Sequence, residues 1–501
     1  MTNRQYRRPA ARAVAAVACL LSLACAACTG GSDDTPPPDG KGEARGPIVV
    51  ASGLDVTGSG GVRQQLIEEW NRRPENKSQQ AKLVELPGGA DQQRSQLLGA
   101  LQSGSARYDV VNLDITWIPE FAEAGLISPM PGTGTGTGTG TGSGSGDDDG
   151  ADAVDLDFIK RVHATTVWKS RSYARPFNTD VGLLYYRPDL LTAAGIQTGR
   201  QPTAAWRWDD LYASVGTLAL SPDRTDDRAG WTTQLKQYEG LTANAIEAFA
   251  SAGVELADSE GRYTSSPEKL KKGLDELLDR ARLGRIQPAA LSSDETAALT
   301  DFAAGRAVFM RHWPYVYGAL KALLPPEAYS VNRLPGFAVL GGQNLAVTAD
   351  SPRAENAREL VTFLTSRESE RCLLDAGFAA TRASAYSNDS RWPCWPRVAA
   401  ALRTAGDSPE AAGTAATPTG TPAPSGEGAR KDQGASARDA YRRTLSAALN
   451  EAVQRPRTPY YGAFTHVLQS HVHALLAARS PDSDAAATEL DADLRDAFAG
   501  K

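Results

Sequence analysis

The fold is decided by the stretch RPFNTDVGLLYYRPDLL, residues 175–191. It opens with a proline turn, passes Asn178 and Asp180, and becomes an apolar, aromatic run that ends at a second proline before helix-like sequence. This order is typical of a chain that leaves one domain and enters a buried strand of another. We therefore expect Asn178 and Asp180 to face a cleft between two domains. A carboxylate and an amide with aromatic residues nearby suit a neutral polyol better than a metal or a phosphate.

The residues before this stretch alternate between short apolar runs and amphipathic segments. They predict strands at 48–52, 81–86 and 108–114 and helices at 62–71 and 91–103. Such alternation predicts an α/β domain with a largely parallel sheet, in which ligands gather at the carboxyl ends of the strands. Asp114 falls at such an end. It is either a ligand-binding residue or a solvated cap on the next helix.

A second informative stretch is FAAGRAVFMRHWPY, residues 302–315. It predicts a helix that stops at Gly305, then a strand, then Trp313 and Tyr315 on either side of a proline. The proline fixes the local backbone, and two amphipathic rings held in this way suit a sugar, whose C–H face packs on an aromatic ring. Interior packing of both rings is the alternative.

The N-terminus has the pattern of an export signal. Four arginines precede an apolar run from Ala13 to Ala27, which is too short to span a bilayer as a permanent helix. Small residues then precede Cys28 and a polar tether over residues 28–46, as in bacterial lipoproteins whose cysteine is lipidated. A secreted protein without a lipid is the alternative.

Removing residues 1–27 deletes four arginines and no acids, so the formal charge moves from −6 to −10. This negative charge argues against a nucleic-acid partner.

The cysteine count predicts one disulfide. Cys19 and Cys25 leave with the signal and Cys28 is expected to be lipidated, so Cys372 and Cys394 remain. An exported protein most economically pairs two such cysteines, closing a loop of about 22 residues. Two separate buried thiols are the alternative.

Two segments have a composition that cannot build a packed core. Residues 131–150 contain alternating Gly-Thr and Gly-Ser pairs, and residues 404–436 are rich in Ala, Gly and Pro, so both are predicted to be insertions. The chain has no GKS or GKT, no GxSxG, no HExxH and no Cys-His metal spacing. We therefore expect no cofactor and no metal site.

Several motifs in order resemble the extracellular solute-binding proteins of bacterial ABC sugar importers, in the branch that binds trehalose, maltose and related oligosaccharides. The resemblance covers nearly everything from residue 47 onward except the insertions. The motifs lie at residues 108–114, 178–187, 237–241, 305–315 and 340–347.

The resemblance implies a two-lobed, periplasmic-binding-protein-like α/β fold of type II. Its lobes are joined by crossover strands and close on a ligand in the cleft between them. Lobe 1 is expected to comprise residues 47–177 and about 322–368. Lobe 2 is expected to comprise residues 178–321 and about 369–501.

The resemblance also implies a set of ligand-binding residues. They are Asp114 as a hydroxyl acceptor on lobe 1, Asn178 and Asp180 at the crossover, Trp313 and Tyr315 as stacking rings on lobe 2, Glu295 as an acceptor on lobe 2, Arg382 as a donor and Gln343 at the cleft floor. Ala380 stands where similar proteins often have proline, so the placement of Arg382 is left open.

The predicted function is capture of a trehalose- or maltose-like di- or oligosaccharide for delivery to the membrane subunits of an ABC permease. The protein is expected to be a non-enzymatic monomer on the extracellular face of the cell membrane, held there by its lipid anchor alone. The alternative is an exported glycosidase, because two carboxyls about 5–10 Å apart are what hydrolysis needs. Asp114 with Asp180 or Glu295 is such a pair.

Overall fold

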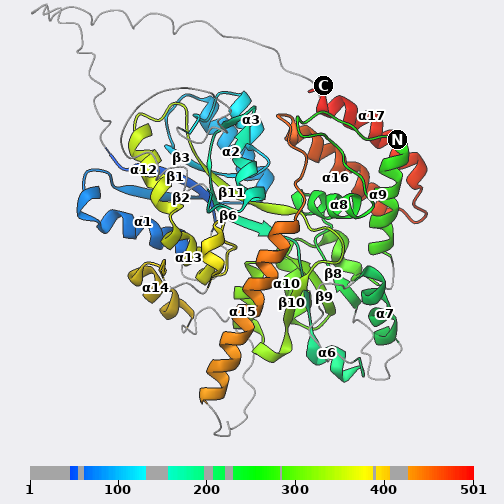
Figure 1. Cartoon of the computed structure of the whole chain (residues 1–501). Helices are drawn as coiled ribbons and strands as arrows, with labels where there is room; N and C mark the ends of the chain where they lie inside the picture. Colours follow the sequence, from blue (N-terminus) through cyan, green and yellow to red (C-terminus); the bar gives the residue numbers. More distant parts are fainter. Residues whose placement is uncertain are drawn as a thin grey trace, which may run out of the picture. The chain divides into compact units, whose positions relative to one another are not determined.

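The computed structural model describes residues 46–54, 61–130, 156–196, 207–219, 229–282, 285–387, 391–406 and 427–501. The predicted signal peptide, Cys28, nearly all of the tether and the 131–150 insertion lie outside these residues. Ala44–Lys501 forms one compact unit, which contains two main sheets (Figure 1). No helix among the described residues is long and apolar enough to cross a membrane.

The first sheet has five strands in the order β2-β1-β3-β11-β6. They are β1 (Ile48–Gly53), β2 (Ala81–Leu86), β3 (Val110–Asp114), β6 (Arg175–Val181) and β11 (Leu340–Val347). Strands β1, β2 and β3 are parallel, as predicted, whereas β11 runs antiparallel to both β3 and β6. The sheet is therefore mixed, because β11 enters it from the opposite end after the chain has visited the second sheet.

Alternate residues of the first sheet enter two different cores. On one face, Ile48 and Val50 pack with helices α1, α12, α13 and α14. On the other face, Val49 and Ala51 join the larger core that contains residues of α2 and α3. The bounds of these helices are Val62–Arg72 for α1, Ala90–Gln102 for α2, Ile118–Glu123 for α3, Ala354–Leu364 for α12, Arg367–Ala376 for α13 and Pro396–Gly406 for α14.

The second sheet has four strands in the order β10-β7-β9-β8, with only the β8–β9 pair parallel among them. Helices α8, α9, α16 and α17 pack against one another beside it (Figure 1). The strands are β7 (Leu183–Tyr186), β8 (Ala229–Thr232), β9 (Ala307–His312) and β10 (Ser330–Arg333), and the helices are α8 (Glu239–Ser251), α9 (Pro267–Arg280), α16 (Tyr461–Ala477) and α17 (Ser483–Phe498).

The remaining elements are short or lie at the borders of the two sheets. Strands β4 and β5 form a small hairpin, and α10 precedes β9 in the chain. Their bounds are Val167–Trp168 for β4, Arg171–Ser172 for β5, Lys160–His163 for α5, Pro188–Ala193 for α6, Trp208–Ala219 for α7, Glu295–Ala303 for α10, Val316–Leu323 for α11 and Glu427–Glu451 for α15.

Three segments meet where the chain crosses between the sheets. Strand β6 passes into β7 through Gly182, residues 334–339 connect β10 to β11, and the residues after α15 pair with this second connection. Val453 N donates to the Ala338 carbonyl at 2.9 Å, and Leu340 N donates to the Val453 carbonyl at 2.7 Å. A Cβ atom at Gly182 would lie 2.3 Å from Glu247 Oε1, so the first crossing needs a residue without a side chain.

The observed pairing corrects the predicted lobe boundaries. Strand β10 pairs with β7 of the second sheet, although residues 322–368 were assigned to lobe 1. Helices α13 and α14 contact α1 against the first sheet, although residues 369–501 were assigned to lobe 2. The difference arises because the chain crosses at residues 334–339 and then stays against the first sheet through α12, α13 and α14.

Helix α15 begins inside the span predicted as the second insertion. Its bounds, Glu427–Glu451, overlap residues 404–436, whereas residues 407–426 lie outside the described part of the chain. The sequence from residue 427 to residue 451 is rich in Ala and Arg, which are strong helix formers. The predicted insertion extends too far because the prediction rested on the glycines and prolines that precede residue 427.

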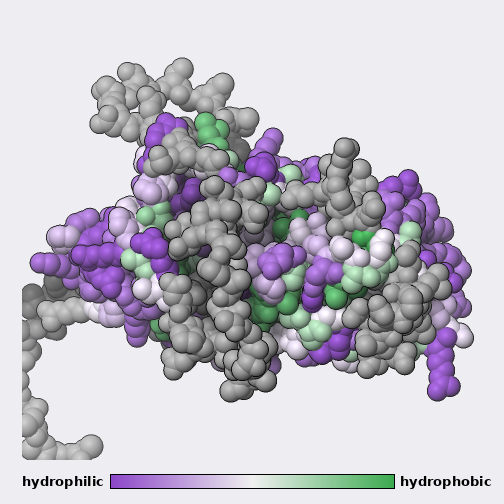
Figure 2. All heavy atoms as spheres, turned by 90° about the horizontal axis from the view of Figure 1, so that it is seen from below, coloured by the Kyte–Doolittle hydropathy of each residue, from purple (hydrophilic) through white to green (hydrophobic). Residues whose placement is uncertain are grey.

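Figure 2 shows one face of the molecule coloured by hydropathy. Among the coloured residues, hydrophobic ones form small groups separated by hydrophilic ones. The large apolar side chains that stay exposed are scattered along the sequence: Leu54, Leu156, Leu323, Phe337, Trp392 and Tyr460. Apolar residues exposed singly in this way are ordinary for a protein surface in water.

The predicted disulfide is present, and it joins α13 to the segment that leads into α14. Cys372 and Cys394 are separated by 22 residues. We expect the double variant Cys372→Ala/Cys394→Ala to lose about 3 kcal/mol in free energy of unfolding, because the unfolded chain is no longer constrained by the closed loop. Urea unfolding of wild type and variant measures this difference. An unchanged midpoint in oxidised wild type and variant would contradict it.

Candidate ligand-binding site

A cavity of about 260 Å³ lies between the carboxyl end of β3 and the N-terminus of α8. A smaller cavity of about 130 Å³ adjoins it, since the two share several lining residues. Of the residues predicted to bind ligand, six line the larger cavity: Asp114, Asp180, Glu295, Trp313, Tyr315 and Gln343. The fold thus brings together Asp114 and Gln343, which are 229 positions apart in the sequence.

The register of strands β3 and β11 explains why Asp114 and Gln343 lie side by side at the cavity. Gln343 of β11 is paired with Asp114 of β3 on one side and with Asn178 of β6 on the other. Gly342 precedes it with a φ of +109°, and a Cβ atom there would lie 2.4 Å from the Asn178 carbonyl oxygen. Glycine therefore allows β11 to approach β6 closely at the cavity floor.

Asp180, at the end of β6, is an unsatisfied acceptor in the cavity wall. Its Oδ1 atom is buried and accepts no hydrogen bond from the described residues, and the residue lines both cavities. Burial raises the pKa of Asp180 to about 7, because the Arg63 guanidinium only partly offsets the loss of water. A ligand that donates a hydrogen bond here would restore what the carboxylate lacks.

The aromatic wall of the cavity is held by charged groups behind it. The Arg311 guanidinium lies 3.8 Å from the centre of the Trp313 ring. Trp313 Nε1 donates to Glu295 Oε1 at 3.2 Å, and the Tyr238 hydroxyl donates to Glu295 Oε2 at 2.7 Å. Glu295 therefore orients two rings toward the cavity, and this use of both its oxygens differs from the predicted role of a simple hydroxyl acceptor.

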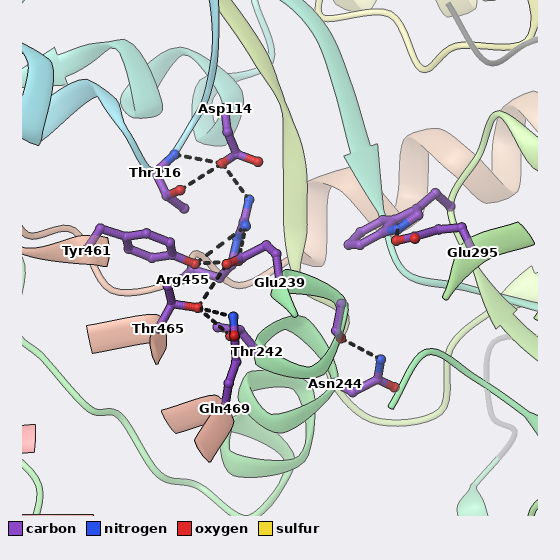
Figure 3. A network of polar contacts seen from close by, with 12 residues as sticks. Asp114, Thr116, Glu239, Thr242, Asn244, Glu295, Arg455, Tyr461, Thr465 and Gln469 are labelled. Carbon is purple, nitrogen blue, oxygen red and sulfur yellow. Dashed lines mark hydrogen bonds and ion pairs between the residues drawn. The ribbon is translucent and has the colours of Figure 1, made fainter. Parts of the chain in front are cut away.

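Arg455 joins the acids on the two sides of the cavity (Figure 3). Its Nη2 atom donates to Asp114 Oδ1 at 2.9 Å, and its Nη1 atom donates to Glu239 Oε1 at 2.5 Å. The arginine side chain is 3% exposed. Asp114 belongs to the first sheet, whereas Glu239 is the first residue of α8, so the guanidinium bridges the two halves of the site.

A set of polar residues supports this bridge. Asp114 also accepts hydrogen bonds from the backbone N and the hydroxyl of Thr116 at 2.9 and 2.8 Å. Glu239 accepts from Tyr461 at 2.5 Å and from Thr465 at 2.9 Å. Burial raises the pKa of Glu239, and Arg455 opposes that rise. The bridge therefore pairs one buried cation with two carboxylates, and it lies at one end of the cavity.

Comparison with known proteins identifies the kind of site. Residues 56–371 match the protein family described as bacterial extracellular solute-binding protein. The chain belongs to this family. Its members bind solutes for transport rather than convert them, so the glycosidase alternative is not supported.

The solute-binding protein is similar to individual relatives as well. A probable ABC transporter-binding protein of Deinococcus radiodurans is 29% identical over 333 residues, which are 64% of this chain and 73% of that protein. The maltose-bound MalE3 structure of T. maritima has a TM-score of 0.66 at 23% identity, covering 90% of this chain and 99% of that one.

A solute-binding protein of Thermotoga lettingae bound with α-D-tagatose has a TM-score of 0.67 at 20% identity, covering 91% of this chain and 100% of that one. The GacH receptor of Streptomyces glaucescens has a TM-score of 0.65 at 18% identity, covering 91% and 99%. These structures confirm the predicted two-lobed fold of type II.

Two predicted residues of the solute-binding protein do not line its cavity. Asn178 is 1% exposed and accepts a hydrogen bond from Arg63 Nη2 at 3.2 Å, so it acts behind the wall. Arg382 is also 1% exposed. Its Nε atom donates to the Thr365 carbonyl at 2.7 Å, and its guanidinium lies 3.9 Å from the centre of the Phe158 ring.

Arg382 is therefore not the donor that was predicted for the cleft. Backbone hydrogen bonds between residues 157–159 and residues 381–383 hold its segment against the start of α5, and Asp157 accepts from its Nη1 atom at 3.4 Å. Burial thus settles the placement of Arg382, whereas Arg455 lines the larger cavity and Arg63 the smaller one.

Sequence reasoning missed several residues that line the cavities. Tyr238 and Glu239 lie in the 237–241 motif, which was used only for the family resemblance, so a closer look at that motif would have found them. Arg63 and Gln93 also line the cavities, but they lie on helices that the sequence analysis interpreted only as part of the fold. Arg455 follows an alanine-rich helix and has no local signal.

The unpaired carboxylate of Asp180 predicts a pH effect on stability. Its folded-state pKa of about 7 exceeds the ordinary value, so the folded protein binds more protons than the unfolded chain between about pH 4 and pH 7. Wild type should therefore lose stability as the pH rises through this window, relative to Asp180→Asn. Urea unfolding of both proteins at about pH 5 and about pH 8 measures it. An equal difference between the proteins at both pH values would contradict this expectation.

The Arg455 bridge predicts a strong effect of removing its cation. Arg455→Ala should cost about 3–5 kcal/mol in free energy of unfolding, because Asp114 and Glu239 are left buried without their partner. The double variant Arg455→Ala/Glu239→Gln should recover part of that loss, since one of the two stranded charges is removed. Urea unfolding of the two variants tests this. A double variant less stable than Arg455→Ala would show that the charges are not the cause.

Proposed function

We propose that this solute-binding protein captures a neutral carbohydrate, a di- or oligosaccharide of the trehalose or maltose type, and delivers it to an ABC import permease. The observation that carries the proposal is the buried, unsatisfied Oδ1 atom of Asp180 in a cavity walled by Trp313 and Tyr315. A sugar supplies a hydroxyl donor and an apolar C–H face at once. A single sugar ring meets both requirements within this one cavity.

The charges around the cavity favour a neutral, donor-rich ligand. Asp114 and Glu239 are compensated by Arg455, and Glu295 is engaged by two ring donors. A phosphate ester would meet four carboxylates in the lining, which would repel it. A sugar that lacks a needed hydroxyl would leave buried groups unpaired, at about 1–3 kcal/mol each, so specificity follows from the polar set.

The crossover between the two sheets links binding of the ligand to recognition by the permease. Ligand contacts come from both sheets, because Asp114 and Gln343 belong to the first and Glu239 and Trp313 follow elements of the second. A ligand that touches both sides favours the closed arrangement over an open one. The closed surface is then the feature that a membrane permease recognises.

The relatives support a carbohydrate while leaving its identity to experiment. Similar structures contain maltose, α-D-tagatose or cycloalternan. Each of those proteins is less than 25% identical to this chain, so the sugars they hold define a panel for testing.

Calorimetric titration of the lipid-free protein, residues 29–501, tests the proposal. The panel comprises trehalose, maltose, maltotriose, cellobiose, sucrose, tagatose and glycerophosphocholine, the last as a charged, non-sugar ligand. We expect one sugar to bind without release of hydrolysis products. Binding of glycerophosphocholine alone, or turnover of any sugar, would refute the proposal.

The aromatic wall provides a matched pair of variants. Trp313→Ala should weaken binding of the identified sugar about tenfold or more, because the lost stacking and buried ring area are together worth about 1.5 kcal/mol or more. Trp392→Ala is the control, since Trp392 is 38% exposed and does not line the cavity. Equal effects of the two substitutions in the same titration would mean that the ring at residue 313 does not touch ligand.

We propose further that the protein is held on the extracellular face of the cell membrane as a monomer, through a lipid on Cys28. Small residues before Cys28 and the polar tether after it support this. The variant Cys28→Ser should move the protein from the membrane pellet to the soluble fraction of expressing cells. Cys25→Ser is the matched control and should stay in the pellet, whereas release of both variants would contradict Cys28 as the site.

A further inference from the structure

A second and larger cavity lies on the other side of the crossover from the sugar site. Its volume is about 810 Å³, and it is lined by residues 453–457, by the loop of residues 253–259 and by Arg161, Lys269 and Phe337. Arg455 belongs to the linings of both cavities. The segment of residues 453–457 therefore separates the two spaces, and the larger one plays no part in the sugar site described above.

Arg457, in the wall of this cavity, is a cation with no ion-pair partner among the described residues. Its Nε and Nη2 atoms are buried and have no hydrogen-bond partner among the described residues. Its nearest ring contact is Trp168, whose centre lies 6.0 Å from the guanidinium carbon. Burial lowers the pKa of Arg457, in keeping with a charge that has lost water and gained no carboxylate.

Two nearby arginines, unlike Arg457, are paired with carboxylates. Arg455, two residues earlier, has two carboxylate partners. Arg262, on the loop that follows residues 253–259, is paired with Asp258 and Glu260. Desolvating a charged group is costly unless the group is paired, so the buried Nε and Nη2 atoms of Arg457 fit an anion that none of the described residues provides.

The other charged residues of the lining also favour an anion. Arg161 donates to the Ala452 carbonyl and Lys269 to the Thr264 carbonyl, so both keep their charge uncompensated among the described residues. Asp258 is held by Arg262 and by two backbone N–H groups. Among the described residues of the lining, three cations without a carboxylate partner thus stand against one such carboxylate, Glu255.

Part of the lining is apolar. Ile246, Val254, Leu256, Val453 and Phe337 contribute to it, and Phe337 is 45% exposed. A bare inorganic ion would satisfy the cations and leave this surface in water. A ligand that carries an oxyanion on an apolar or aromatic body would satisfy both parts of the lining.

We propose that this cavity is a second binding site, separate from the sugar cleft, for a small organic oxyanion with an apolar or aromatic body. Arg457 binds the oxyanion, Arg161 and Lys269 add to the positive field, and the apolar wall beside Phe337 receives the body of the ligand. The protein thus has two ligand chemistries on the two sides of residues 453–457: a neutral polyol in the cleft and an organic anion behind it.

Three probes test the two parts of the proposal in the mature, full-length protein. Phenyl phosphate carries both the oxyanion and the ring, inorganic phosphate carries the charge alone, and phenol carries the ring alone. Calorimetric titration should show phenyl phosphate binding more tightly than either of the other two. Equal affinities for phenyl phosphate and phenol would overturn the role of the cations.

Variants then locate the site. Arg457→Gln should weaken phenyl phosphate binding about tenfold or more, because a charge-assisted hydrogen bond is lost. Arg72→Gln is the control of the same residue type and should bind like wild type, because Arg72 is paired with Glu68 on α1 and does not line this cavity. Trp313→Ala, which alters the sugar cleft, should also bind phenyl phosphate like wild type. Unchanged binding in Arg457→Gln, or loss in Trp313→Ala, would overturn the proposal.

Stability without any probe provides an independent readout. If Arg457 exists to bind an anion, Arg457→Gln should unfold at the same temperature as wild type or at a higher one, because an unpaired buried charge has been removed. A lower unfolding temperature would show that the arginine serves the fold through its contact with Trp168, and it would overturn the proposal.

Discussion

The buried ion pair between Glu247 and Arg311 is the interaction on which both the crossover and the binding site depend. The two side chains are each 1% exposed and lie 2.7 Å apart. Glu247 Oε1 also accepts a hydrogen bond from Val339 N at 3.1 Å, in the second connection, and occupies the space that a side chain at residue 182 would need. One carboxylate therefore holds two of the three crossing segments.

The same pair fixes the aromatic wall of the cleft. Arg311 lies under the ring of Trp313. Its backbone carbonyl accepts a hydrogen bond from Gln234 Nε2, and its Nη1 atom donates one to Gln234 Oε1. A guanidinium that is locked by a buried carboxylate keeps the ring above it in one place. Removal of either charge would strand its partner in the interior, so the position of Trp313 is tied to the packing of the second sheet.

Three arginines illustrate three uses of a buried cation in one molecule. Arg311 stabilises the core beneath the site, and Arg455 bridges acids from the two halves of the cleft. Arg457 has no carboxylate partner in the part of the chain that the structure describes, which leaves it available to a ligand. The chemistry of each follows from which acids the fold brings near it, since their side chains are identical.

Local signals in the sequence determined the α/β alternation, the crossing at residues 175–191, the paired rings at residues 313 and 315 and the disulfide, because each depends on periodicity, on a proline or on a residue count. The tertiary structure alone decided that Arg382 is buried, that Arg455 reaches Asp114 across 341 residues of sequence and that β10 belongs to the second sheet. These depend on which distant segments meet when the core is packed, and no short window of sequence carries that information.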